Sequence, residues 1–73
     1  MNSTGQFVTV IVNGQPRQVA EGMSVAGLLA DLGLVSGPVA VEVNLELVPR
    51  AQHARQPLAE GDRVEIVTLV GGG

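Results

Sequence analysis

The 73-residue sequence contains few side chains that could perform chemistry, and their spacing fits no catalytic arrangement. Cysteine is absent, which excludes disulfides, thiolate metal sites and a cysteine nucleophile. Ser24 precedes an apolar helical stripe and is explained as its N-cap. His53 is the one general base near neutral pH, but it follows Arg50 and precedes Arg55 in a polar stretch, which favours an exposed or partly packed surface histidine. We therefore predict a non-enzymatic protein without a metal site.

The charge of the sequence narrows the possible partners. The net charge is −3, and an acidic chain cannot form the basic stripe that neutralises nucleic-acid phosphates. A turn and a solvated strand explain Glu60, Asp62 and Glu65 as well as a cation site would, and they do not resemble a calcium loop. No apolar run approaches the roughly 20 residues of a membrane span, and residues 1–6 lack signal-peptide features. We expect a cytoplasmic protein that binds neither nucleic acid nor membranes.

The C-terminal Gly71-Gly72-Gly73 directly follows a strand rich in valine and leucine. Three glycines extend about 10 Å and, without Cβ atoms, can enter a channel too narrow for other residues. The group at their tip is the Gly73 carboxylate, a poor acyl donor until it is activated, for example by adenylation. The pattern suggests a carrier that another enzyme activates and loads at Gly73, with Gly71 and Gly72 threading into the active site. A frayed terminus is the alternative.

Hydrophobic periodicity predicts one helix and several short strands. Val25, Leu28, Leu29 and Leu32 form a helical stripe, and Gly27 suggests close packing of this helix on a sheet. Asn13-Gly14 is a strong hairpin signal between two strands. The predicted strands are 7–12, 15–20, 39–43, a short one around 46–48, and 63–70, and the predicted helix is about 25–32.

One amphipathic helix covers one face of a sheet, which predicts a two-layer α+β domain with the β-grasp, ubiquitin-like arrangement and four to five strands in a mixed sheet. Strand 15–20 should lie at an edge, the last strand beside the first, and strand 39–43 parallel to the first. Residues 1–6 are expected to be a disordered extension, 7–70 the domain and 71–73 a flexible tail. The predicted core is Val10, Val12, Leu28, Leu29, Leu32, Val41, Val43, Val64 and Ile66.

Val67 and Leu69 alternate with the core residues of the last strand and point to the uncovered face of the sheet. Exposed apolar side chains often mark protein contacts. We therefore predict a partner surface that includes Val67, Leu69 and Val70. Burial of Val67 and Leu69 under the loop 49–57 is the alternative.

Several segments in this order resemble the ThiS family of sulfur carrier proteins of thiamin biosynthesis, bacterial relatives of ubiquitin. They are Val12-Asn13-Gly14, Val39-Ala40-Val41-Glu42-Val43-Asn44, Val48-Pro49-Arg50, Glu60-Gly61-Asp62-Arg63-Val64-Glu65-Ile66-Val67 and Gly72-Gly73. Leu45 stands where the family often has a turn glycine, which leaves Asn44 to supply any left-handed conformation. His53 stands where a tryptophan is frequent, and its role is open.

The resemblance implies that an E1-like enzyme, ThiF, uses Mg-ATP to adenylate the Gly73 carboxylate. Sulfur from a cysteine desulfurase would convert it to a thiocarboxylate, and thiazole synthase, ThiG, would take that sulfur. The carrier would bind no cofactor and would be a monomer when alone. A sulfur carrier for a different product, either the small subunit of molybdopterin synthase or a carrier for cysteine or another thio-metabolite, shares these features. A ubiquitin-like interaction module with an inert tail is a third hypothesis.

Overall fold

A computed structural model describes residues 5–35 and 37–69. Seven elements follow one another along the described chain. They are β1 (Phe7–Val12), β2 (Gln15–Ala20), α1 (Val25–Asp31), β3 (Val39–Val43), β4 (Glu46–Val48), the 3₁₀ helix η1 (Arg50–Arg55) and β5 (Arg63–Thr68). The predicted strands and helix are therefore confirmed, with β5 ending at Thr68 and α1 ending one residue before Leu32.

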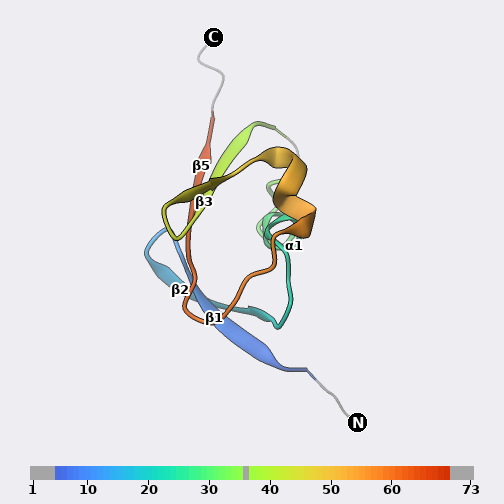
Figure 1. Ribbon diagram of the computed structural model, residues 1–73, viewed down its shortest axis with the longest axis vertical. Coiled ribbons are helices and arrows are strands. Elements are labelled where there is room, and N and C mark those ends of the chain that lie inside the picture. The colour runs from blue at the N-terminus through green and yellow to red at the C-terminus, as the bar shows by residue number, and fades with distance from the viewer. Residues whose placement is uncertain (1–4, 36, 70–73) are drawn as a thin grey trace.

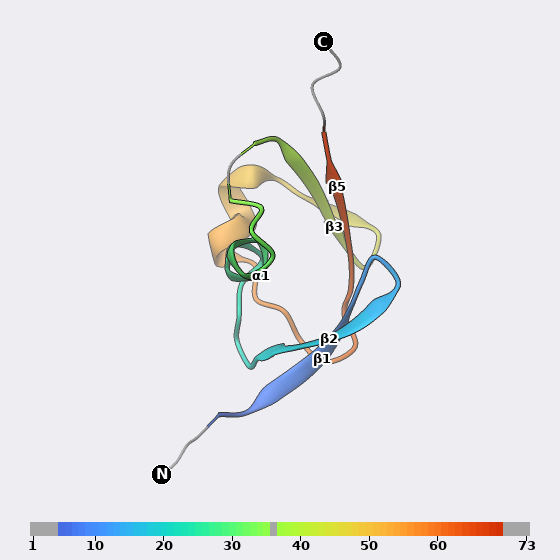
Figure 2. The ribbon, with the colours of Figure 1, turned by 180° about the vertical axis from the view of Figure 1, so that it is seen from behind.

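The five strands form one mixed sheet in the order β2-β1-β5-β3-β4, and α1 lies on one side of it (Figures 1 and 2). The last strand pairs in parallel with β1 and antiparallel with β3, and β2 is an edge strand, as predicted. The prediction that β3 lies parallel to β1 is wrong, because β3 is antiparallel to β5. The β1–β2 hairpin reverses the chain, and a helical crossover then returns it in the direction of β2.

Local sequence explains both ends of α1. The Ser24 hydroxyl oxygen accepts a hydrogen bond from Gly27 N at 3.0 Å, which confirms Ser24 as the N-cap. Gly33 has φ +76°, the left-handed conformation that ends many helices. The close packing at Gly27 has a different cause from the predicted one. A Cβ there would lie 3.0 Å from Cγ of Met23, so the neighbour is a side chain preceding the helix and not the sheet.

The core lies between α1 and the inner face of the sheet. Every predicted core residue is buried except Leu32, which is half-buried because α1 ends before it. Val19 and Leu58 were not predicted to be in the core but are 2% and 3% exposed. Val19 is the one buried side chain of an otherwise exposed edge strand. Leu58 lies outside any strand or helix, and its N–H donates to Met23 O at 2.8 Å.

His53 is buried, which corrects the prediction of a surface histidine. Its side chain is 8% exposed, and Nε2 lies 3.1 Å from Val48 O. A carbonyl oxygen only accepts, so Nε2 carries the proton in this hydrogen bond. A 3₁₀ helix returns to the same side every three residues, so η1 turns Gln52 and Arg55 outwards and places Arg50 on the side of His53.

The two-residue turn between β3 and β4 contains two residues with positive φ. Asn44 has φ +53° and Leu45 has φ +72°, so Asn44 is not the only left-handed residue as the sequence suggested. Tight hairpins prefer the type I′ turn, which needs positive φ at both central positions. The Leu45 side chain is 87% exposed and gains little from packing to offset this conformation.

Candidate partner surface and the end of strand β5

Strand β5 leads to the C-terminal residues, and it is the central strand of the sheet. β3 pairs with it from Val43 opposite Val64 to Val39 opposite Thr68. β1 pairs with it only at its beginning, through Val12 opposite Val64. The second half of β5 therefore has a strand on one side only.

The side chain of Asn13 takes the place of the missing strand. Its Oδ1 accepts from Ile66 N at 2.7 Å, and its Nδ2 donates to Ile66 O at 3.1 Å. The Asn13 backbone N–H also donates to Val64 O at 2.9 Å. Asn13 has φ +49°, so the hairpin turn that ends β1 also directs this amide along β5. An amide that donates and accepts at one residue imitates a paired strand and satisfies both backbone groups of Ile66.

A second asparagine fixes the beginning of β5 from the opposite side. Asn44 Oδ1 accepts from Arg63 N at 3.0 Å, and the Asn44 backbone N–H donates to Arg63 O at 2.8 Å. Asn44 Nδ2 donates to Asp62 Oδ1 at 3.0 Å, and the other oxygen of Asp62 accepts from Ala59 N at 2.8 Å. Two turn asparagines thus hold β5 in place between β1 and β3.

Two carboxylates of the turn before β5 have structural partners. Besides Asp62, the Glu60 Oε1 atom accepts from Thr9 N at 2.9 Å. Within residues 5–35 and 37–69, no group of three or more histidine and acidic side chains could hold a metal ion. The turn therefore accounts for Glu60 and Asp62, in keeping with the structural explanation considered from the sequence.

The last described residue remains attached to the sheet. Leu69 N–H donates to Pro38 O at 2.9 Å, which continues the pairing of β5 with the segment before β3. Val70, Gly71, Gly72 and Gly73 lie outside the described residues, so the roles predicted for them stay predictions. The structure supplies the firmly held strand from which residues 70–73 continue.

Val67 and Leu69 are exposed, as the sequence predicted. Their side chains are 55% and 50% exposed. Their burial under the loop 49–57 is thereby excluded, and η1, within that loop, packs with α1 on the other side of the sheet (Figures 1 and 2). The uncovered side of the sheet is available to a partner at the end of β5.

The outer face, defined here by Ala40, Glu42, Leu47, Glu65 and Val67, combines apolar and acidic groups. Strand register places Val67 opposite Ala40, and Glu65 opposite Glu42. Leu47 lies opposite Glu42 on β4 and is 64% exposed. Like charges directly opposite each other disfavour the isolated sheet slightly. A partner with an apolar centre and a basic rim would complement this face.

Known proteins resemble this chain in sequence. A family model described as the ThiS family matches residues 10–73. The chain is 31% identical over 64 residues to the sulfur carrier protein ThiS of Escherichia coli, covering 88% of this chain and 97% of that protein. It is 38% identical over 64 residues to ThiS of Thermus thermophilus, covering 88% and 98%.

Longer relatives and a solved structure agree with this match. The chain is 44% identical over 64 residues to a thiazole synthase of Paramagnetospirillum magneticum, covering 88% of this chain and 20% of that protein. It thus spans about a fifth of the length of the thiazole synthases that it matches. The crystal structure of the thiamine biosynthesis protein ThiS from Geobacter metallireducens has a TM-score of 0.77 and 35% identity, covering 90% of this chain and 100% of that one.

No helix in the described part of the chain is both long and apolar enough to cross a membrane. The mixed five-stranded sheet with its helix is the β-grasp fold of the solved ThiS structure. Together with the match over residues 10–73, these findings show that the chain belongs to the ThiS family of sulfur carrier proteins.

Proposed function

We propose that this protein carries sulfur as a thiocarboxylate at Gly73 and donates it to thiazole formation in thiamin biosynthesis. The family match that extends to residue 73 is the observation that carries the proposal. The two asparagines that hold β5 support it, because a carrier must present its reacting group at a fixed distance from the surface that a partner recognises.

The chemistry belongs to the partners, and the carrier is their cosubstrate. In the active site of an E1-like enzyme, ThiF, the Gly73 carboxylate attacks the α-phosphate of Mg-ATP. This step forms the acyl adenylate and releases pyrophosphate. A persulfide, supplied through a cysteine desulfurase, displaces AMP, and reductive cleavage of the resulting acyl disulfide by a thiol leaves the thiocarboxylate. Gly71 and Gly72 pass through the narrow part of the active site, since they have no Cβ atoms. Because adenylation consumes ATP, we place the protein in the cytoplasm.

Thiazole synthase, ThiG, is the proposed acceptor of the sulfur. Two relatives named thiazole synthase contain a segment similar to this chain, and that segment makes up about a fifth of their length. Joining two sequences in one polypeptide keeps the carrier segment at a high effective concentration near its partner. A separate carrier must gain the same proximity through its surface, and we assign this contact to the outer face with Leu69 and Val70.

The experiment is ATP–pyrophosphate exchange with the purified activating enzyme, using the wild type and two tail variants. Deletion of Gly73 moves the carboxylate back by about 3.3–3.6 Å, and a displacement of even 1 Å costs on the order of 10²-fold in such a step. An alanine appended after Gly73 should be equally damaging. Thermal unfolding should be unchanged in both. Exchange at the wild-type rate by both variants would refute the carrier function and leave an interaction module.

Intact-mass spectrometry then separates the carrier pathways. After incubation with ATP, the activating enzyme and a persulfide source, one oxygen of the wild type should be replaced by sulfur. The thiocarboxylate protein should lose that sulfur to thiazole synthase supplied with its other substrates. Loading without transfer to thiazole synthase would assign the protein to another sulfur pathway if the loaded protein serves instead as the small subunit of a molybdopterin synthase or gives its sulfur to a cysteine-forming enzyme.

A further inference from the structure

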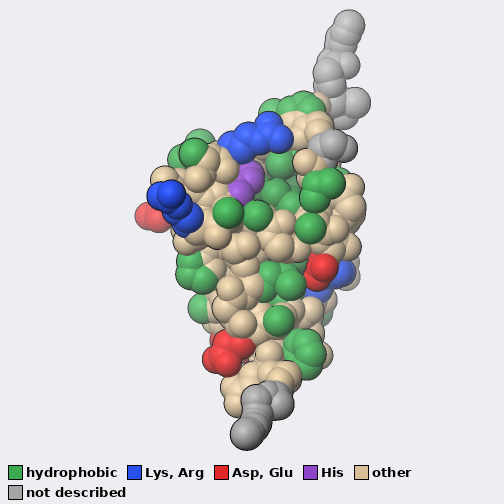
Figure 3. All heavy atoms as spheres, turned by 90° about the vertical axis from the view of Figure 1, so that its right-hand side faces the viewer, with side chains coloured by type: hydrophobic (Ala, Val, Ile, Leu, Met, Phe, Trp, Pro, Cys, Tyr) green, Lys and Arg blue, Asp and Glu red, His purple; other side chains and the backbone are tan. Residues whose placement is uncertain are grey.

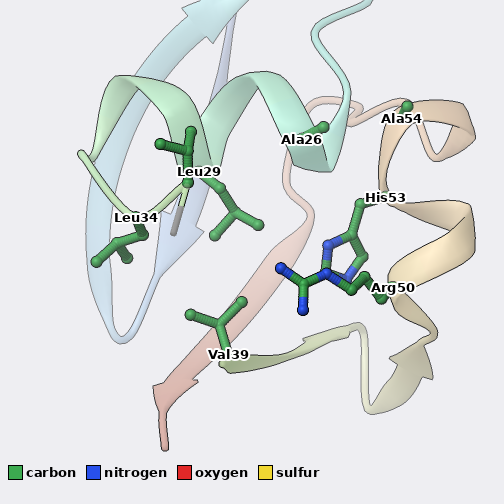
Figure 4. Close-up of a pocket in the computed structure, with 8 residues that line it drawn as sticks. Ala26, Leu29, Leu34, Val39, Arg50, His53 and Ala54 are labelled. Carbon is green, nitrogen blue, oxygen red and sulfur yellow. The ribbon is translucent and has the colours of Figure 1, made fainter. Parts of the chain in front are cut away.

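A cavity of about 230 Å³ lies on the side of the molecule opposite the outer face. It opens between α1, η1 and the beginning of β3, where Figure 3 shows the single histidine beside a basic side chain and several hydrophobic ones. The apolar lining residues include Ala26, Leu29, Leu34, Val39 and Ala54, and the polar ones are Arg50 and His53 (Figure 4). The carrier chemistry proposed above uses none of these residues.

The size and the walls of the cavity fit a small hydrocarbon group. An apolar cavity of about 150 Å³ is known to hold benzene. The volume here therefore accommodates a benzene-sized group and about two or three further atoms. Leu29 is 5% exposed and packs in the core, so its wall of the cavity is firmly held.

Arg50 gives the cavity a positive group. Figure 4 shows its guanidinium group beside the His53 ring, directed towards the space between Leu29 and Val39. None of the described residues that line the cavity is acidic. A guanidinium group presents paired N–H donors that match a carboxylate. The hydrogen bond from His53 Nε2–H to Val48 O fixes the imidazole as a wall next to it.

We propose that this cavity binds a small organic carboxylate with an aromatic or branched hydrocarbon body. The carboxylate pairs with Arg50, and the hydrocarbon lies against Leu29, Leu34 and Val39. Free acids and the apolar C-terminal residue of a peptide share this chemistry. Because the site and the outer face lie on opposite sides of the sheet, both can be occupied at once, and the proposal does not depend on the carrier function.

The test is a titration of ¹⁵N-labelled full-length protein with 3-phenylpropionate, followed by amide chemical shifts. Saturable shifts are expected at Ala26, Val39 and Ala54, with Val67 unchanged. The neutral 3-phenylpropionamide and the cationic 3-phenylpropylamine should bind at least about tenfold more weakly, because an ionic hydrogen bond is worth about 1.5–3 kcal/mol. An acetylated tripeptide ending in phenylalanine, compared with its C-terminal amide, distinguishes a peptide from a free acid.

Two variants on η1 make the test specific. Arg50→Gln should weaken 3-phenylpropionate at least about tenfold, whereas Arg55→Gln, which removes a charge from the same helix but does not line the cavity, should leave affinity unchanged. Thermal unfolding of both variants checks that the fold is intact. Equal affinity for the acid and the amine, equal affinity of Arg50→Gln and wild type, or shifts that do not saturate would each overturn the proposal.

Discussion

The two hydrogen bonds from Asn13 to Ile66 allow a quantitative test of how β5 is held. Asn13→Gly removes both bonds, of 2.7 and 3.1 Å, while glycine tolerates the φ of +49° without strain. At about 0.5–1.5 kcal/mol each, their loss should lower the free energy of unfolding by about 1–3 kcal/mol. For a domain of this size each kcal/mol shifts Tm by about 4–8 °C. Asn13→Ala should be less stable still, by about 1–2 kcal/mol, because it adds a strained backbone.

Chemical denaturation gives the free energies, and amide hydrogen exchange shows where the change occurs. In Asn13→Gly the Ile66 amide loses its acceptor, so its exchange should accelerate more than that of Leu69, whose N–H donates to Pro38 O. An Asn13→Gly variant as stable as the wild type, with unchanged exchange at Ile66, would show that the side chain does not replace a strand. The same variant with normal stability but slower adenylation would point instead to a direct contact with the partner.

Three further predictions concern the turn, the core and the partner surface. Leu45→Gly should raise the free energy of unfolding by about 0.5–1 kcal/mol, since relief of the strained positive φ outweighs the conformational entropy that glycine loses on folding. Leu47→Gly, in a strand, should lower it. Urea denaturation of both variants shows whether each free energy rises or falls. Leu29→Ala should cost about 2–5 kcal/mol in the same assay, and an unchanged midpoint would remove Leu29 from the core. Leu69→Asp should keep its Tm but weaken binding to the activating enzyme by about 1.5–3 kcal/mol in calorimetry, and full affinity would exclude Leu69 from the interface.

Local signals in the sequence were sufficient for the elements and for the exposed part of the candidate site. Asn13-Gly14 defined the hairpin, and Ser24 defined the start of α1, because each acts through its immediate neighbours. The exposure of Val67 followed from strand alternation and from a single helix covering one face. These inferences need no knowledge of which strands pair.

The burial of His53 and the second role of Asn13 depend on partners far along the chain. His53 is buried because η1 packs against α1, and a six-residue 3₁₀ helix is too short to display a hydrophobic period. Asn13 was interpreted as a turn residue only, since its second partner, Ile66, lies 53 residues away. The positive φ of Leu45 was not predicted, because the residues expected at such turn positions are glycine, asparagine and aspartate, and not leucine.

The strand order has a consequence for how this protein behaves at high concentration. The sheet ends at β2, where Pro16 offers no N–H, and at β4, which is three residues long and is followed by Pro49. Short strands and prolines at the edges give another chain little backbone with which to extend the sheet. In the proposed function a carrier that gives up its sulfur returns to the carboxylate and is loaded again, so each molecule must stay soluble through many cycles. The edges of the sheet therefore disfavour aggregation, while its outer face remains free for recognition.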